Sequence, residues 1–126
     1  MIVRMYEIIN FDHFYNEVKN QKLPFKILYK LSNLAKAIDE KTIFYREKLQ
    51  EVLKEYGELD ENGNLIPTDD GRGIKIRIGT EHECYTKVNE LQNLEVEMPE
   101  IKFDIEDFGN IEMTIDTFNL IRPFLN

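Results

Sequence analysis

Residues 24–57, PFKILYKLSNLAKAIDEKTIFYREKLQEVLKEYG, carry the longest regular pattern in the chain. A mostly apolar stripe recurs there every three or four positions, at Ile27, Leu31, Leu34, Ile38, Thr42, Tyr45, Leu49, Val52 and Tyr56. This spacing predicts one amphipathic helix over residues 24–56. Pro24 suits the first turn of a helix, and Gly57 suits a left-handed cap just beyond its end.

The predicted helix is long for a chain of 126 residues. At about 1.5 Å per residue it would extend on the order of 50 Å. We therefore expect either a bend near residues 39–42, where the stripe turns polar, or a partner for one end. Glu47, Glu51 and Glu55 are spaced four apart in this helix. They predict either a solvated face or a docking row.

The segments on either side of the helix give weaker signals. Residues 2–9 are apolar and β-branched and predict a strand, and Asp12 would cap a short helix over residues 13–20. Asn62-Gly63 predicts a tight turn. Ile74, Ile76 and Ile78 alternate with basic residues and predict a half-buried strand.

A second helix should run from Thr80 to about residue 93. Thr80 and Glu83 have the spacing of a capping box, and Cys84, Val88 and Leu91 give this helix an inner face.

The last third of the chain alternates between apolar and polar residues. Residues 94–98, 101–105 and 111–115 each predict a short strand; the alternative for the last of these is that Thr114 caps a terminal helix over residues 116–121. We therefore predict an α+β fold, in which a long N-terminal helix or helical hairpin packs on a small antiparallel sheet from the C-terminal half. Residues 1–126 would form a single domain, mainly helical in 1–63 and composed of strands plus short helices in 64–126.

The charge is unevenly distributed. The chain has 24 acidic and 16 basic side chains, for a formal net charge of −8. Much of the excess lies in residues 95–116, which contain Lys102 as their one basic residue and the acids Glu95, Glu97, Glu100, Asp104, Glu106, Asp107, Glu112 and Asp116. A charge of this sign argues against direct nucleic-acid binding. No apolar run reaches the roughly 18 residues of a membrane span, so no membrane association is expected.

Catalytic and metal chemistry have little support in the sequence. His82 and Cys84 are two positions apart on a predicted helix, so they point away from each other, and neither a metal nor a cofactor is predicted. Cys84 occupies an inward position, where a buried thiol is expected. We predict no catalytic residue and no enzyme. A small enzyme stays as an alternative that a cavity lined by carboxylates with shifted pKa values would support.

Several segments together resemble a family of small proteins, a domain of unknown function, encoded by phages and prophages of low-GC Gram-positive bacteria. In chain order these are KLPFK at 22–26, EYGELDENGN at 55–64, NEL at 89–91, EVE at 95–97, IKFDI at 101–105, and IEMTI with LIRPF at 111–115 and 120–124. The resemblance implies a viral context, an assembly or host-interaction role, and a location in the bacterial host cytoplasm or the virion. It implies no catalytic residues.

The predicted function is a non-enzymatic protein-interaction module, either a phage assembly factor or a minor virion component. Its partner would be a viral or host protein, or a second copy of the chain. The alternative is an acidic inhibitor that mimics nucleic-acid charge against a host defence enzyme. The candidate interaction residues are Glu47, Glu51, Glu55, Glu95, Glu97, Asp104 and Glu112.

Overall fold

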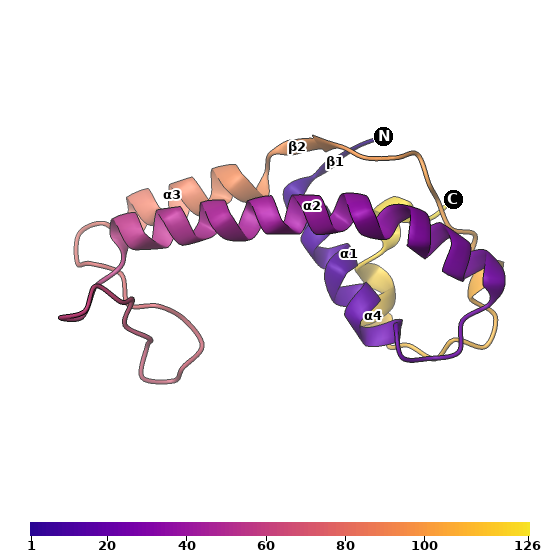
Figure 1. Ribbon diagram of the computed structural model, residues 1–126, viewed down its shortest axis with the longest axis horizontal. Helices are drawn as coiled ribbons and strands as arrows, with labels where there is room; N and C mark the ends of the chain where they lie inside the picture. The colour runs from indigo at the N-terminus through magenta and orange to yellow at the C-terminus, as the bar shows by residue number, and fades with distance from the viewer. The chain divides into compact units, whose positions relative to one another are not determined.

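The computed structural model describes all 126 residues, and the chain forms two compact units. Unit 1 contains residues 1–43 and 94–126, and unit 2 contains residues 44–93. Along the chain (Figure 1) the elements are β1 (Ile2–Arg4), α1 (Met5–Val18), α2 (Phe25–Tyr56), α3 (Glu81–Gln92), β2 (Glu95–Glu97), the 3-10 helix η1 (Ile105–Phe108), α4 (Ile115–Asn119) and the 3-10 helix η2 (Arg122–Phe124). The fold is α+β, as predicted.

Helix α2 confirms the long helix predicted from the stripe. It is assigned without interruption from Phe25 to Tyr56, including residues 39–42. There, the hydroxyl of the buried Thr42 donates to the Asp39 carbonyl at 3.1 Å, so the polar residue in the stripe has a partner inside the helix. Residues 25–43 of the helix belong to unit 1 and residues 44–56 to unit 2.

The end of α2 differs from the prediction. Gly57 does not have a positive φ, so it is not a left-handed cap. A Cβ atom at this position would clash with the Leu65 side chain and would lie 2.5 Å from the Leu53 carbonyl oxygen. Glycine is therefore required there by close packing.

Unit 1 has an aromatic core. Phe11 and Phe14 of α1 are fully buried together with Phe103 and Phe124. The rings of Phe11 and Phe124 lie 4.7 Å apart edge to face, and those of Phe11 and Phe103 lie 6.0 Å apart and are stacked. Such pairs add specific geometry to apolar burial. The first half of α2 contributes Ile27, Leu31, Leu34 and Ile38 to the buried residues of this unit.

Helix α1 starts earlier than predicted. The strand expected over residues 2–9 ends at Arg4, and the helix expected from residue 13 begins at Met5. The reason is a helical spacing within an apolar run, since Met5, Ile8 and Phe11 are all buried on one helix face.

The sheet is the main correction to the predicted fold. It has two antiparallel strands, β1 and β2, in the register Ile2 to Glu97, Val3 to Val96 and Arg4 to Glu95. One strand therefore comes from the N-terminus, and the sheet does not come from the C-terminal half alone. Residues 101–104 and 110–114 form no strands, although Phe103 makes an isolated bridge to Leu125. The alternation predicted strands here incorrectly, because these extended segments lie on the core without pairing with a neighbouring strand.

Unit 2 combines the second half of α2, α3 and residues 57–80 between them. As predicted, Cys84 and Leu91 of α3 are buried and Val88 is half-buried. The predicted capping box is wrong, because the Thr80 side chain makes no cap bond and its hydroxyl donates to the Arg77 carbonyl at 2.7 Å. None of the helices combines the length and apolar content that crossing a bilayer requires.

Residues 57–80 are held by a closed set of three backbone hydrogen bonds, which we call the three-way ring. Glu58 N–H donates to the Lys75 carbonyl at 2.8 Å, Lys75 N–H to Ile66 at 2.8 Å, and Ile66 N–H to Glu58 at 3.2 Å. Gly63 and Gly71 take positive φ in the turns between these residues, as tight turns require. The strand predicted at 74–78 is wrong, since Ile74 and Ile76 form only isolated bridges and Ile78 is 92% exposed.

Candidate interaction surface

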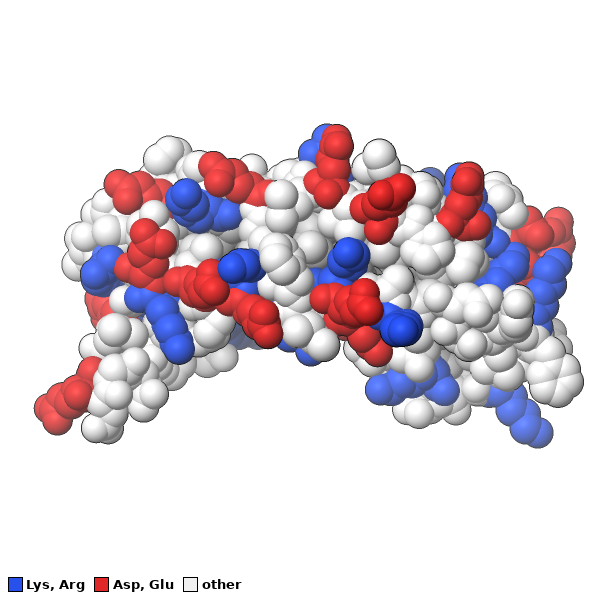
Figure 2. Space-filling model, turned by 45° about the horizontal axis from the view of Figure 1, so that its top comes forward, with Lys and Arg blue, Asp and Glu red and all other residues white.

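The seven acids predicted from sequence lie in several places. Glu47, Glu51 and Glu55 are on the part of α2 within unit 2, whereas Glu95, Glu97, Asp104 and Glu112 are in unit 1. Glu95 and Glu97 are exposed on β2 and flank the buried Val96. Figure 2 shows acidic and basic side chains interspersed over the visible face. Of the four acids in unit 1, only Glu95 and Glu97 lie on a strand, so these acids do not share one sheet face.

Asp104 belongs to an ion cluster that stabilises unit 1. Its neighbour Asp107 accepts from the Lys26 ammonium at 3.0 Å and from the Lys30 ammonium at 3.2 Å. Asp104 lies 3.8 Å from Lys26. The hydrogen bond from Lys26 lowers the pKa of Asp107, with further contributions from the Asp104 N–H and from Lys30. The same contact raises the pKa of Lys26. The Asp107 side chain is only 8% exposed, so its charge is paired within the fold and is not displayed to a partner.

An exposed aromatic pair lies on the first two turns of α2. The side chains of Phe25 and Tyr29 are 91% and 71% exposed, and Leu28 between them is also exposed. Residues at these spacings share one side of a helix. The opposite side of the same turns buries Ile27 and Leu31 in the core of unit 1. The helix is therefore anchored on one side and apolar on its solvent side.

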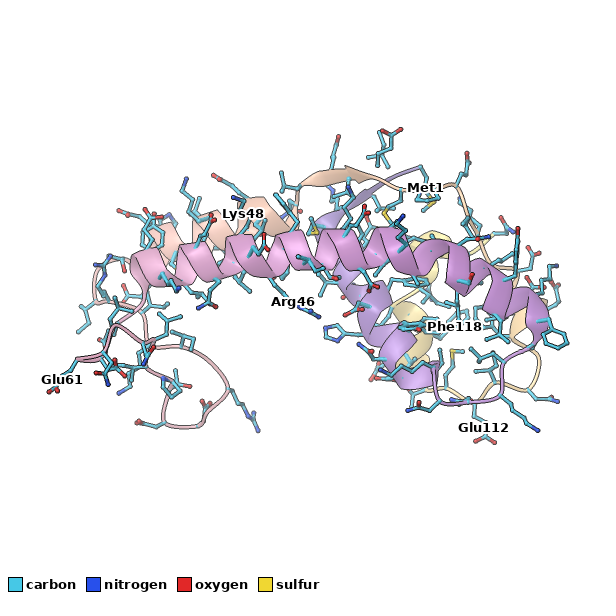
Figure 3. All side chains as sticks on the ribbon, viewed as in Figure 1. Met1, Arg46, Lys48, Glu61, Glu112 and Phe118 are labelled. Atoms are coloured by element: carbon cyan, nitrogen blue, oxygen red, sulfur yellow. The ribbon has the colours of Figure 1, made fainter.

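A hollow of about 580 Å³ lies directly before these turns in the chain. It is lined by Lys22, Leu23 and Pro24, and by Gly109, Asn110 and Ile111 from the other side. The two sides are linked because the Gln21 amide donates to the Glu112 carbonyl at 3.0 Å. The carboxylate of Glu112 points away from the ribbon (Figure 3). We call this hollow, together with Phe25, Leu28 and Tyr29, the α2-entry surface.

The segment that leads into α2 and forms its first half is basic. From Val18 to Ile38 the sequence contains five lysines and no acid: Lys19, Lys22, Lys26, Lys30 and Lys36. Lys26 and Lys30 face Asp107, whereas Lys19 and Lys22 form no ion pair within the chain. This surface was not among the residues predicted from the sequence. The signals that identify it are the run without acids and the two aromatic residues that fall outside the apolar stripe.

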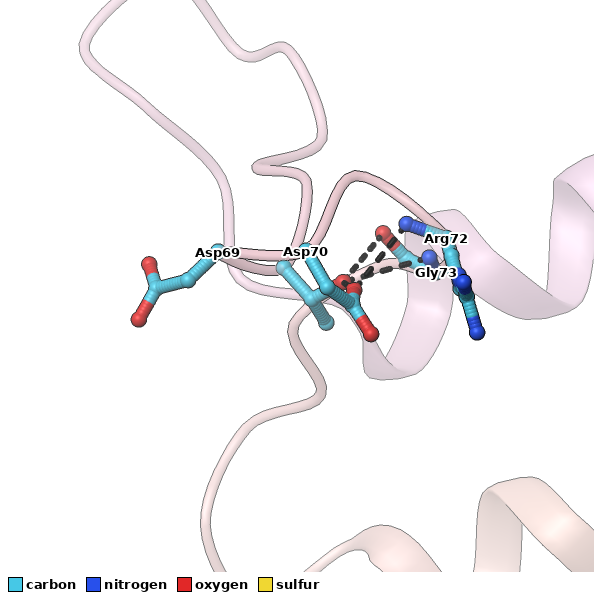
Figure 4. Close-up of a pocket in the computed structure, with 5 residues that line it drawn as sticks. Asp69, Asp70, Arg72 and Gly73 are labelled. Atoms are coloured by element: carbon cyan, nitrogen blue, oxygen red, sulfur yellow. Dashed lines mark hydrogen bonds between the residues drawn. The ribbon is translucent and has the colours of Figure 1, made fainter.

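A second hollow, of about 540 Å³, lies at the turn around Asp70 in unit 2 (Figure 4). Its polar groups bond to one another. The Thr68 hydroxyl donates to Asp70 Oδ1 at 2.5 Å, and the Arg72 N–H donates to the same oxygen at 3.0 Å. These bonds lower the pKa of Asp70. These bonds account for the shape of the turn.

The remaining reactive groups do not assemble into a site. No group of three or more His, Cys, Asp or Glu side chains is placed to hold a metal ion. Cys84 is buried, and this burial raises the pKa of its thiol, which disfavours the nucleophilic thiolate. The α2-entry surface is therefore the feature that structure and charge together single out.

Comparisons with protein-family models, with curated proteins and with solved structures find no match for this chain.

Proposed function

We propose that this chain is a non-catalytic protein-interaction module that docks a partner protein through the α2-entry surface. The observation that carries the proposal is the exposure of Phe25 and Tyr29 on a helix whose other side is firmly buried. Aromatic side chains are enriched at protein interfaces and are frequent energetic anchors there. Leaving two of them in water is unfavourable, and a partner would remove that apolar surface from solvent.

The core of unit 1 holds the α2-entry surface in place. Ile27 is fully buried directly behind Phe25, and the Gln21 bond to Glu112 holds the two sides of the hollow together. Less conformational entropy is lost when the docking groups are already ordered. This arrangement favours binding with little rearrangement of the chain.

The resemblance to phage proteins suggests the setting of this interaction. In that setting the module would be an assembly factor or a minor virion component, acting in the bacterial cytoplasm or within the virion. The neighbouring genes test this part of the proposal. Capsid and tail genes would support it, whereas a cluster of early genes would favour the inhibitor alternative.

The inhibitor alternative has less support. Nucleic-acid mimicry needs many carboxylates displayed together, and Asp104 and Asp107 are instead paired with Lys26. Glu95 and Glu97 are the exposed acids that this alternative still has on the sheet. Their replacement by glutamine would abolish inhibition of a defence enzyme if mimicry were the function.

Docking is tested by capturing the partner from phage-producing cells and then measuring affinity with the two purified proteins. The double variant Phe25→Ala with Tyr29→Ala should weaken binding by at least about tenfold, because it removes both anchors. Tyr85→Ala is the matched control, since Tyr85 is an aromatic residue of unit 2 that is 69% exposed. Equal affinity for the wild type and the double variant would contradict the proposal.

A further inference from the structure

We infer that the partner segment that occupies the α2-entry surface is an acidic peptide segment carrying at least one large apolar side chain. This inference rests on the proposed docking function and adds the chemistry of the partner. Its grounds are the apolar lining of the hollow and the charges near it.

The hollow is suited to an apolar side chain. Leu23, Pro24 and Ile111 supply apolar carbon to its lining, and Phe25 and Tyr29 are exposed on the turns of α2 that follow Pro24 in the chain. Its volume of about 580 Å³ is within the range of pockets that enclose small ligands, so a leucine, phenylalanine or tryptophan side chain can enter it. Lys22 is the one charged group in the lining.

The charges around the hollow select the sign of the partner. Lys22 lies in the lining, and Lys19 is three residues earlier in the sequence. Neither lysine forms an ion pair with a carboxylate of the chain. Of the nearby acids, Asp104 and Asp107 are paired with Lys26, whereas the exposed Glu112 carboxylate forms no ion pair and points away from the ribbon (Figure 3). A carboxylate on the partner would pair with Lys22, whereas a basic partner would meet these lysines and be repelled.

A peptide fits these observations better than a nucleic acid. Nucleic-acid affinity depends on neutralising several phosphates at once. Lys22 is the one unpaired lysine that lines the hollow, and the whole chain carries a net charge of −8. A peptide with one or two carboxylates beside an apolar side chain matches this small positive charge.

The test is selection of short random peptides by display on the wild-type chain, with counter-selection on the Phe25→Ala, Tyr29→Ala double variant. The expected consensus contains Asp or Glu beside Leu, Phe or Trp. The selected peptides should bind the Lys19→Glu, Lys22→Glu variant at least about tenfold more weakly, and added salt should weaken their binding to the wild type. Circular dichroism of each variant shows that it is folded, and Tyr85→Ala serves as the exposed-aromatic control.

The outcomes separate the inference from the proposed function. Peptides that need Phe25 and Tyr29 but lack acids would overturn the inference and leave the docking function intact. No peptide dependent on Phe25 and Tyr29 would overturn both. An oligothymidylate that binds the wild type as tightly as the best peptide, or self-association that the double variant abolishes, would also overturn the inference, because each identifies a different occupant.

Discussion

Gly57 is the residue at which a single methyl group should have the largest effect on unit 2. Its Cβ would meet the Leu53 carbonyl oxygen at 2.5 Å, and that oxygen is fixed within α2. We expect Gly57→Ala to lower the free energy of unfolding by about 1–3 kcal/mol, through overpacking. Urea denaturation measures this.

Gly73→Ala is the matched control for Gly57→Ala. The nearest atoms to its added Cβ belong to Thr68 and lie 3.9 Å away, which is ordinary contact. A Gly57→Ala variant as stable as Gly73→Ala would show that the loop relaxes around the methyl group.

Asp107 should make the stability of unit 1 depend on pH. Its pKa in the folded chain lies below the ordinary value of 3.8, because the carboxylate is held by Lys26 and Lys30. A lowered pKa means that this group stabilises the fold above its unfolded pKa and that the contribution is lost as pH falls through the folded pKa. The stability difference between the wild type and Asp107→Asn should therefore be largest at neutral pH and shrink below about pH 4.

Thermal unfolding of both proteins at a series of pH values measures that difference. Glu61→Gln is the control, because Glu61 is exposed at a turn and forms no ion pair within the chain. Its difference from the wild type should stay flat over the same range. A difference for Asp107→Asn that does not change with pH would exclude the proposed role of this carboxylate.

At the scale of an element, α4 depends on its cap. The Thr114 hydroxyl accepts from the Thr117 N–H at 3.1 Å, which satisfies one of the donors that a helix start leaves open. Thr114→Ala should cost about 1 kcal/mol of stability, and Thr114→Ser should restore most of it. Thr86→Ala is a control within α3, where an exposed alanine favours the helix. Equal melting temperatures for Thr114→Ala and the wild type would rule out this cap contribution.

The elements also show what the sequence could predict. A stripe of nine residues over α2 is long enough to identify a helix by its period alone, and Thr114 identified the start of α4 correctly. Alternation over five residues was too short to decide, because residues 101–105 lie extended and then turn into η1 without a neighbouring strand. Strand pairing is a long-range property, and the partner of β2 proved to be residues 2–4.

The candidate surface was harder to predict than the fold. The composition shows how many acidic residues the chain has, and the acids were therefore chosen as candidates. It does not show which of these acids form ion pairs with lysines. Phe25 and Tyr29 fall outside the apolar stripe, but only the structure shows that both are exposed while Ile27 is buried. Exposure depends on which other segments cover a helix side, and a single sequence does not contain that information.

For the whole molecule, burial predicts an uneven resistance to opening. Within unit 2, the buried residues are Tyr56, Gly57, Cys84 and Leu91, whereas unit 1 contains the aromatic core. Amides around Phe11 and Leu34 should therefore exchange hydrogen more slowly than those around Leu49 and Val88, because local opening of unit 2 exposes less apolar surface. Hydrogen exchange resolved by residue measures this, and uniform protection across both units would contradict it.

The three-way ring has a consequence for how the chain tolerates change. It joins Glu58, Ile66 and Lys75 and so divides the long loop of residues 57–80 into two hairpins, each closed at its base. Each hairpin has a glycine in the turn at its tip. Closing a longer loop costs little, roughly 0.6 kcal/mol for each doubling of its length. Residues inserted between Asn62 and Gly63, or between Asp70 and Gly71, would thus extend one tip while the base stays closed. These two tips are the natural places to attach a tag, a fluorophore or a grafted epitope without disturbing either helix.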